Sequence, residues 1–205
     1  MISKRISKKH KYYNTENSLP LLVIMKGESV IKEEQYNSEQ HTDPVKIDKN
    51  IIGQFFPEVT SKSLAGRVVP LPEAVGVKVT LMCIVFVRSA SSMIDSWVQP
   101  FEREFWKDSS FAFYEIPMIN SAWKVIYWMI GSGMKRGIPI EKHDNLATFY
   151  GDYSSYKEAL GMEDTNFAYV FLLDKKGIVQ WKGRGYANPE IEREFIEVAK
   201  ALKDN

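Results

Sequence analysis

Apolar residues fill residues 78–87, KVTLMCIVFV, without the alternation of a strand that has one face in water. We interpret this stretch as a strand covered on both faces, and therefore as a central strand of a sheet. Pro100 lies inside the helix that the next residues predict, where it removes a backbone donor and favours a kink. In that segment apolar residues recur at the spacing of one helix face: Ile94, Trp97, Val98, Phe101 and Phe105.

The remaining hydrophobic runs predict strands and helices in alternation. Gly177 lies in the turn of a closing hairpin, at a position suited to a positive φ. Helices that connect strands imply parallel pairing, whereas the closing hairpin adds antiparallel strands. The sequence therefore predicts an α/β fold of the thioredoxin-like type, with a central mixed sheet and helices on both faces. The predicted strands are 111–118, 146–152, 167–174 and 178–183, and the predicted helices are 121–134, 153–160 and one that begins at Asn188 and Pro189.

The first part of the chain differs from this pattern. Residues 1–13 are basic and contain no acid, and a polar stretch, NTENS, follows where a secretory signal would continue into an apolar region. We expect residues 1–45 to form an N-terminal extension that is partly disordered. Residues 46–205 are then expected to form one thioredoxin-like domain.

Charge and composition narrow the classes of function. The formal net charge is +1, from 27 basic and 26 acidic residues, which argues against nucleic acid as a partner. The longest apolar run has the length of a strand and falls short of the roughly 20 residues that span a bilayer. A single cysteine, Cys83, cannot form an internal disulfide, which is typical of a reducing compartment.

The turn between the central strand and the following helix is the place where thioredoxin-like proteins keep a reactive cysteine pair. Here it holds Ser89, Ser91, Ser92 and Met93. Dithiol exchange needs a thiolate and a second thiol within reach, and this turn supplies neither. The alternative is a thiol-dependent reductase or a peroxidase-like enzyme that uses Cys83. That residue lies in mid-strand, so we expect a buried, packing cysteine.

Other chemistry at the turn has simpler interpretations. A nucleophilic serine needs a base, and the spacing of His10, His41 and His143 does not bring one to Ser91. We expect Ser91 or Ser92 to cap the helix, while a small anion held near Arg88 stays open. The glycines of residues 131–137 are interpreted as a helix end and not as a phosphate loop. The sequence contains no cluster of metal ligands, and we expect neither a metal nor a cofactor.

The predicted helix 121–134, SAWKVIYWMIGSGM, is apolar on two adjacent stripes. A helix on one face of a sheet buries only one stripe, so the second must meet something else. Cover by the chain's own extension, such as residues 19–25, is one interpretation. A hydrophobic client or a membrane surface is the other. The residues at issue are Trp123, Tyr127 and Trp128.

Three blocks of the sequence resemble one known family. Residues 52–87, SWVQPF at 96–101 and YVFLLDKKGIVQWKGRGYANPE at 169–190 are similar to the mitochondrial ATP synthase assembly-factor family, within the thioredoxin-like superfamily. The resemblance implies help in building the membrane sector of ATP synthase, as a chaperone for its proton-channel subunit on the matrix side. It also implies a mitochondrial matrix location, whereas the N-terminus alone suggests a cytoplasmic chain.

These observations together predict a non-catalytic, redox-inactive protein that binds or chaperones a hydrophobic or membrane-protein partner. A membrane subunit of ATP synthase is the partner that the resemblance implies, and a peripheral contact with a membrane is compatible with it. The sequence predicts neither the oligomeric state nor cleavage of the basic segment. The expected partner-binding residues are Arg88, Ser91, Ser92, Met93, Trp97, Trp123, Tyr127 and Trp128.

Overall fold

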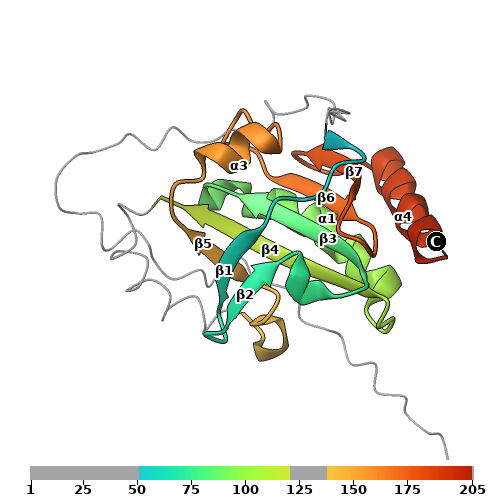
Figure 1. Cartoon of the computed structure of the whole chain (residues 1–205). Coiled ribbons are helices and arrows are strands. Elements are labelled where there is room, and N and C mark those ends of the chain that lie inside the picture. The colour runs from blue at the N-terminus through green and yellow to red at the C-terminus, as the bar shows by residue number, and fades with distance from the viewer. Residues whose placement is uncertain (1–50, 121–137, 205) are drawn as a thin grey trace, which may run out of the picture. The chain divides into compact units, whose positions relative to one another are not determined.

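The computed structural model describes residues 51–120 and 138–204. The predicted extension 1–45 and the predicted helix 121–134 lie outside these residues. The described chain forms a seven-stranded sheet of order β2-β1-β5-β4-β3-β6-β7 (Figure 1). Its strands are β1 (Val59–Ser63), β2 (Val68–Leu71), β3 (Val79–Val85), β4 (Phe111–Ile119), β5 (Ala147–Tyr150), β6 (Tyr169–Leu173) and β7 (Val179–Arg184).

The centre of the sheet is mixed, as the sequence predicts. β3 pairs in parallel with β4, and β4 pairs in parallel with β5. β6 pairs antiparallel with both β3 and β7. Every residue of β3 is buried, because its two neighbours and the layers above and below leave no side in water.

Helices cover both faces of this sheet. α1 (Ser91–Phe105) and α4 (Pro189–Lys203) pack together on one face, where Trp181 of β7 contacts Trp97 of α1 and Phe195 of α4. The next residue of β7, Lys182, points to the opposite face and bonds Gly161, just after α3 (Ser154–Ala159). The predicted thioredoxin-like arrangement is therefore confirmed.

The start of α4 follows its sequence signal closely. The Asn188 side chain accepts hydrogen bonds from the backbone N–H groups of Glu190 and Ile191, at 3.0 and 2.9 Å. Pro189 is the first helical residue, where its missing N–H costs nothing. Gly177 has a φ of 81°, which confirms the turn that the sequence predicts between β6 and β7.

The β1–β2 hairpin was not predicted, and it forms one edge of the sheet. Ser61 and Ser63 are buried while Lys62 between them is exposed, so the buried face of β1 carries little hydrophobic signal. Pro70 in β2 removes a donor from the outer edge, which protects this edge from pairing with another chain. The hairpin thus consists of a short strand with two serines on its buried face and a four-residue strand, and hydrophobic periodicity does not detect elements this short.

Candidate functional site

The site lies where β3 passes into α1. A 3-10 turn, η6 (Arg88–Ala90), leads directly into α1 at Ser91. Arg88, Ser91 and Ser92 are exposed, whereas Met93 and Trp97 are 1% and 0% exposed. Met93 and Trp97 therefore support the turn from beneath and do not reach solvent in this structure, whereas the partner contact expected of this set of residues stays a prediction.

The predicted cap at Ser91 or Ser92 is wrong. Ala90 occupies the N-cap position, and the helix has no side-chain cap hydrogen bond. The reason is the 3-10 turn, in which the Ala90 and Ser91 N–H groups already donate to the carbonyls of Val87 and Arg88. This turn places Ala90 at the N-cap, so Ser91 and Ser92 are already the first two residues of the helix and neither occupies the position from which a side chain caps it.

Ala90 is the N-cap of α1 and Met93 is its third residue, so both lie at the helix N-terminus, the kind of place where a cysteine gains thiolate character. Ala90 has no reactive group. The Met93 sulfur accepts a weak hydrogen bond from the Ala168 N–H, at 3.5 Å, and so ties α1 to the loop before β6. The turn is thus held by packing and by a thioether, and it offers no thiol for exchange.

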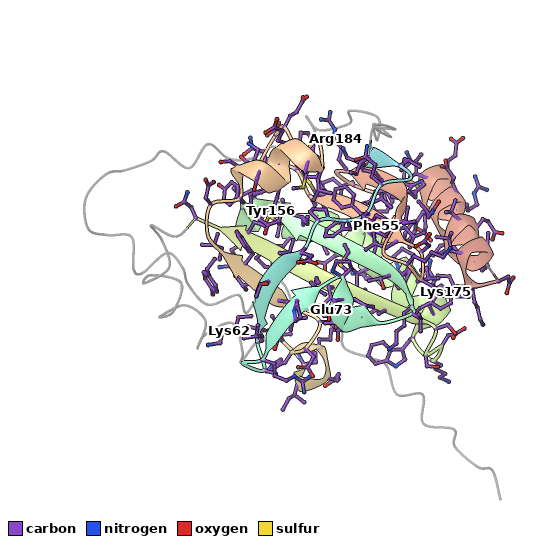
Figure 2. The ribbon with its side chains drawn as sticks, in the orientation of Figure 1. Phe55, Lys62, Glu73, Tyr156, Lys175 and Arg184 are labelled. Carbon is purple, nitrogen blue, oxygen red and sulfur yellow. The ribbon has the colours of Figure 1, made fainter. Side chains whose placement is uncertain are left out.

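The last residue of β7, which is partly exposed, and Tyr186 after it complete the surface beside the turn. The Ser92 hydroxyl lies 2.7 Å from the hydroxyl of Tyr186, which is 41% exposed. Arg184 ends β7, at the top of the view in Figure 2, and its guanidinium lies 4.8 Å from the ring centre of Phe167. We call the surface made by Arg88, Ser91, Ser92, Arg184 and Tyr186 the turn face.

Sequence reasoning missed Arg184 and Tyr186. The signal was present, because both belong to the block 169–190 that carries much of the family resemblance. Trp97 explains how they reach the turn: its indole N–H donates to the Gly185 carbonyl at 2.7 Å, inside the core. Gly185 has a φ of 73°, which allows the chain to bend there and place Tyr186 against Ser92.

Cys83 is remote from this surface. It lies in the middle of β3 with an exposed fraction of 0%, paired with Glu115 on β4 and Val170 on β6. Burial raises the pKa of its thiol well above the usual value, and the charges of Glu115 and Asp95 raise it further. The geometry therefore gives the thiol-enzyme alternative no accessible nucleophile.

Other candidate groups are separate from the turn face. His143 lies in another loop, where one ring nitrogen is 3.0 Å from the Ile138 carbonyl. Among residues 51–120 and 138–204, no group of three His, Cys, Asp or Glu side chains is arranged to hold a metal ion. In the same residues, no helix has the length and apolar character needed to cross a bilayer. Trp123, Tyr127 and Trp128 lie outside the part that the structure describes.

The family follows from a comparison with family models. The model described as ATP10 protein matches residues 34–202, which is most of the chain and all of the turn face. The chain belongs to the ATP10 protein family. This is the ATP synthase assembly family that the sequence blocks resemble, so that prediction is confirmed. No curated protein matches this ATP10 family member closely enough to count as a relative.

Solved structures support the fold of this ATP10 family member. An uncharacterized conserved protein from Geobacillus kaustophilus aligns with a TM-score of 0.56 and 12% identity, over 78% of this chain and 87% of its own. BsSco, a member of the Sco family of cytochrome c oxidase assembly proteins, aligns with a TM-score of 0.50 and 16% identity, over 77% and 98%. A candidate thiol:disulfide interchange protein, DsbE, from Chlorobium tepidum gives 0.50 and 16%, over 77% and 99%. At these identities the similarity establishes the fold alone.

Proposed function

We propose that this ATP10 family protein is a non-catalytic assembly factor that binds a hydrophobic or membrane-protein partner of ATP synthase through the turn face. Family membership supports the link to ATP synthase assembly. The observation that supports the non-catalytic part is the turn itself, because residues 88–94, from η6 into the first turn of α1, contain no cysteine. Binding without turnover is the use of this site that its residues support best.

The turn face suits a binding role because it is fixed and chemically mixed. Trp97 and Met93 hold it from below through bonds to Gly185 and Ala168. Tyr186 offers a half-exposed ring with a hydroxyl, a side-chain type enriched where proteins meet partners. Arg88 adds an exposed cation at the rim. A preformed surface of this kind loses little conformational entropy on binding.

Two further statements belong to the same proposal. The protein acts in the mitochondrial matrix, as its family suggests, and it meets the membrane sector there. The extension, residues 1–45, is separate from the thioredoxin-like domain, residues 46–205. The family match, residues 34–202, covers nearly all of this domain and also the last residues of the extension.

Site-specific crosslinking tests the turn face as the place of contact. A photoreactive phenylalanine analogue at position 91 is expected to capture a membrane subunit of ATP synthase in mitochondria that express this chain. The matched control is position 109, because Ser91 and Ser109 are both exposed serines and lie at opposite ends of α1. We expect capture from position 91 to exceed capture from position 109 by roughly 10-fold, as for a specific contact. Equal capture from both positions, or none from position 91, would refute the proposal.

A further inference from the structure

Three acidic side chains and the thiol gather between α1 and the sheet. Glu115 lies in the middle of β4, on the same side as Phe111, whose ring stacks on Phe105 of α1 with centres 4.0 Å apart. Cys83 is its register partner on β3 and faces the same way. Glu115 therefore points toward α1 from a strand that is otherwise made of apolar and aromatic residues.

Among residues 51–120 and 138–204, the charges around Glu115 do not balance. Asp95 and Glu102 are two turns apart on α1, so both lie on one side of that helix. The counter-charge comes from Lys142 in η8 (Ile140–Lys142), whose ammonium lies 2.7 Å from one oxygen of Glu102. The other Glu102 oxygen is buried with no hydrogen-bond partner in the described residues. One ammonium thus serves three carboxyl groups.

Of the three carboxyl groups, that of Glu115 is the one whose ionised form is favoured least. Its backbone N–H donates to the Asn145 carbonyl at 2.8 Å, which fixes the strand but does nothing for the carboxyl group. Burial raises its pKa to about 7, and Asp95 and Glu102 raise it while Lys142 lowers it. Burial also raises the pKa of Asp95, against the effect of Lys142.

We propose that Glu115 is a proton-binding switch beneath α1, neutral in the folded protein on the acidic side of neutrality and ionised on the alkaline side. Ionisation places a further negative charge beside Asp95 and Glu102, where Lys142 is the one ammonium that the described residues supply, and weakens the packing of α1 on the sheet. Ser91 lies one helical turn before Asp95, so a change in how α1 packs on the sheet also moves Ser91 and Ser92 of the turn face. The proposal itself concerns the purified chain and holds whatever the partner is.

The direction of the pH effect follows from linkage. An unfolded glutamate releases its proton near pH 4.5, whereas Glu115 in the folded chain releases it near pH 7. Between these values the folded state binds more protons than the unfolded state, so stability falls as pH rises. The unfolding equilibrium constant is expected to rise by roughly 30-fold between about pH 5.5 and about pH 8.5 from this group.

Urea unfolding across this pH range tests the switch. In E115Q the unfolding equilibrium constant should lack the roughly 30-fold rise between about pH 5.5 and about pH 8.5 that we assign to Glu115. E73Q is the matched control, because Glu73 is an exposed carboxylate in η5 (Glu73–Val75), and it should keep the wild-type dependence. If E115Q follows the wild-type curve, the proposal is wrong.

A second measurement needs no variant and so covers the case in which E115Q does not fold. The carboxyl carbon of Glu115, followed by NMR in the native wild-type chain, should titrate with a midpoint near 7. A midpoint near 4.5, the value of an ordinary glutamate, would overturn the proposal. The NMR result is independent of ATP synthase, so its failure would leave the proposed binding function standing.

Discussion

Replacing Trp97 with alanine is expected to lower the free energy of unfolding by about 3–5 kcal/mol, the range for removing a large buried aromatic side chain. The ring is 0% exposed and lies among Trp181, Phe195 and the sheet, with ring centres 5.3 and 5.8 Å away. Its loss leaves a cavity where α1, α4 and β7 meet. Chemical denaturation of the purified variant measures the effect.

Trp97→Phe is the matched control, because it keeps most of the ring volume and removes the indole N–H. The Gly185 carbonyl then loses a buried 2.7 Å bond, which costs about 1–3 kcal/mol. We expect this variant to fold and to disturb the position of Tyr186 beside Ser92. A loss below about 1 kcal/mol for Trp97→Ala would show that this cluster is not the centre of the core.

Lys182→Ala is the second substitution with a large expected effect, a loss of about 3 kcal/mol of unfolding free energy. Lys182 is 2% exposed, and its ammonium donates to the Gly161 carbonyl at 3.0 Å. It also lies about 6 Å from the ring centres of Tyr169 and Phe171. Alanine removes both the packed stem and the bond that ties the end of α3 to β7.

Two control variants separate the contributions of the Lys182 aliphatic chain and of its ammonium group to stability. Denaturant unfolding measures all three variants. Lys182→Met keeps an apolar stem of similar length, so we expect a smaller loss of about 1–2 kcal/mol, due to the unpaired carbonyl. Lys176→Ala changes an exposed lysine in the turn before β7 and should stay within about 0.5 kcal/mol of wild type. If Lys182→Ala proved as mild as Lys176→Ala, the buried ammonium would not hold this face together.

Much of the fold could be predicted because its strongest signals are local. The apolar run at 78–87 predicts the buried strand, which the structure places at Val79–Val85. Asn188 and Pro189 predict the start of α4, because both act within one helical turn. The prediction that Ser91 or Ser92 caps α1 was wrong, because the 3-10 turn before them leaves no visible signal in the sequence.

The turn face could be predicted only in part, because it joins distant segments. Ser92 and Tyr186 are 94 residues apart, and no periodicity relates them. The burial of Lys182 also runs against the usual exposure of lysine. Glu115 did carry a signal: a glutamate in the apolar strand FAFYEIPM is unusual enough to indicate an acid that is at least partly buried.

The central claim is that this chain assists ATP synthase assembly without thiol chemistry, and Cys83→Ala tests it most directly. Alanine at this buried position leaves only a small cavity, at a cost of about 1 kcal/mol, so the variant should fold. The measurement is the amount of assembled ATP synthase in cells whose only copy carries Cys83→Ala, beside wild-type and deletion cells. The account predicts wild-type assembly. Assembly at the level of the deletion, with folded Cys83→Ala protein present, would contradict it.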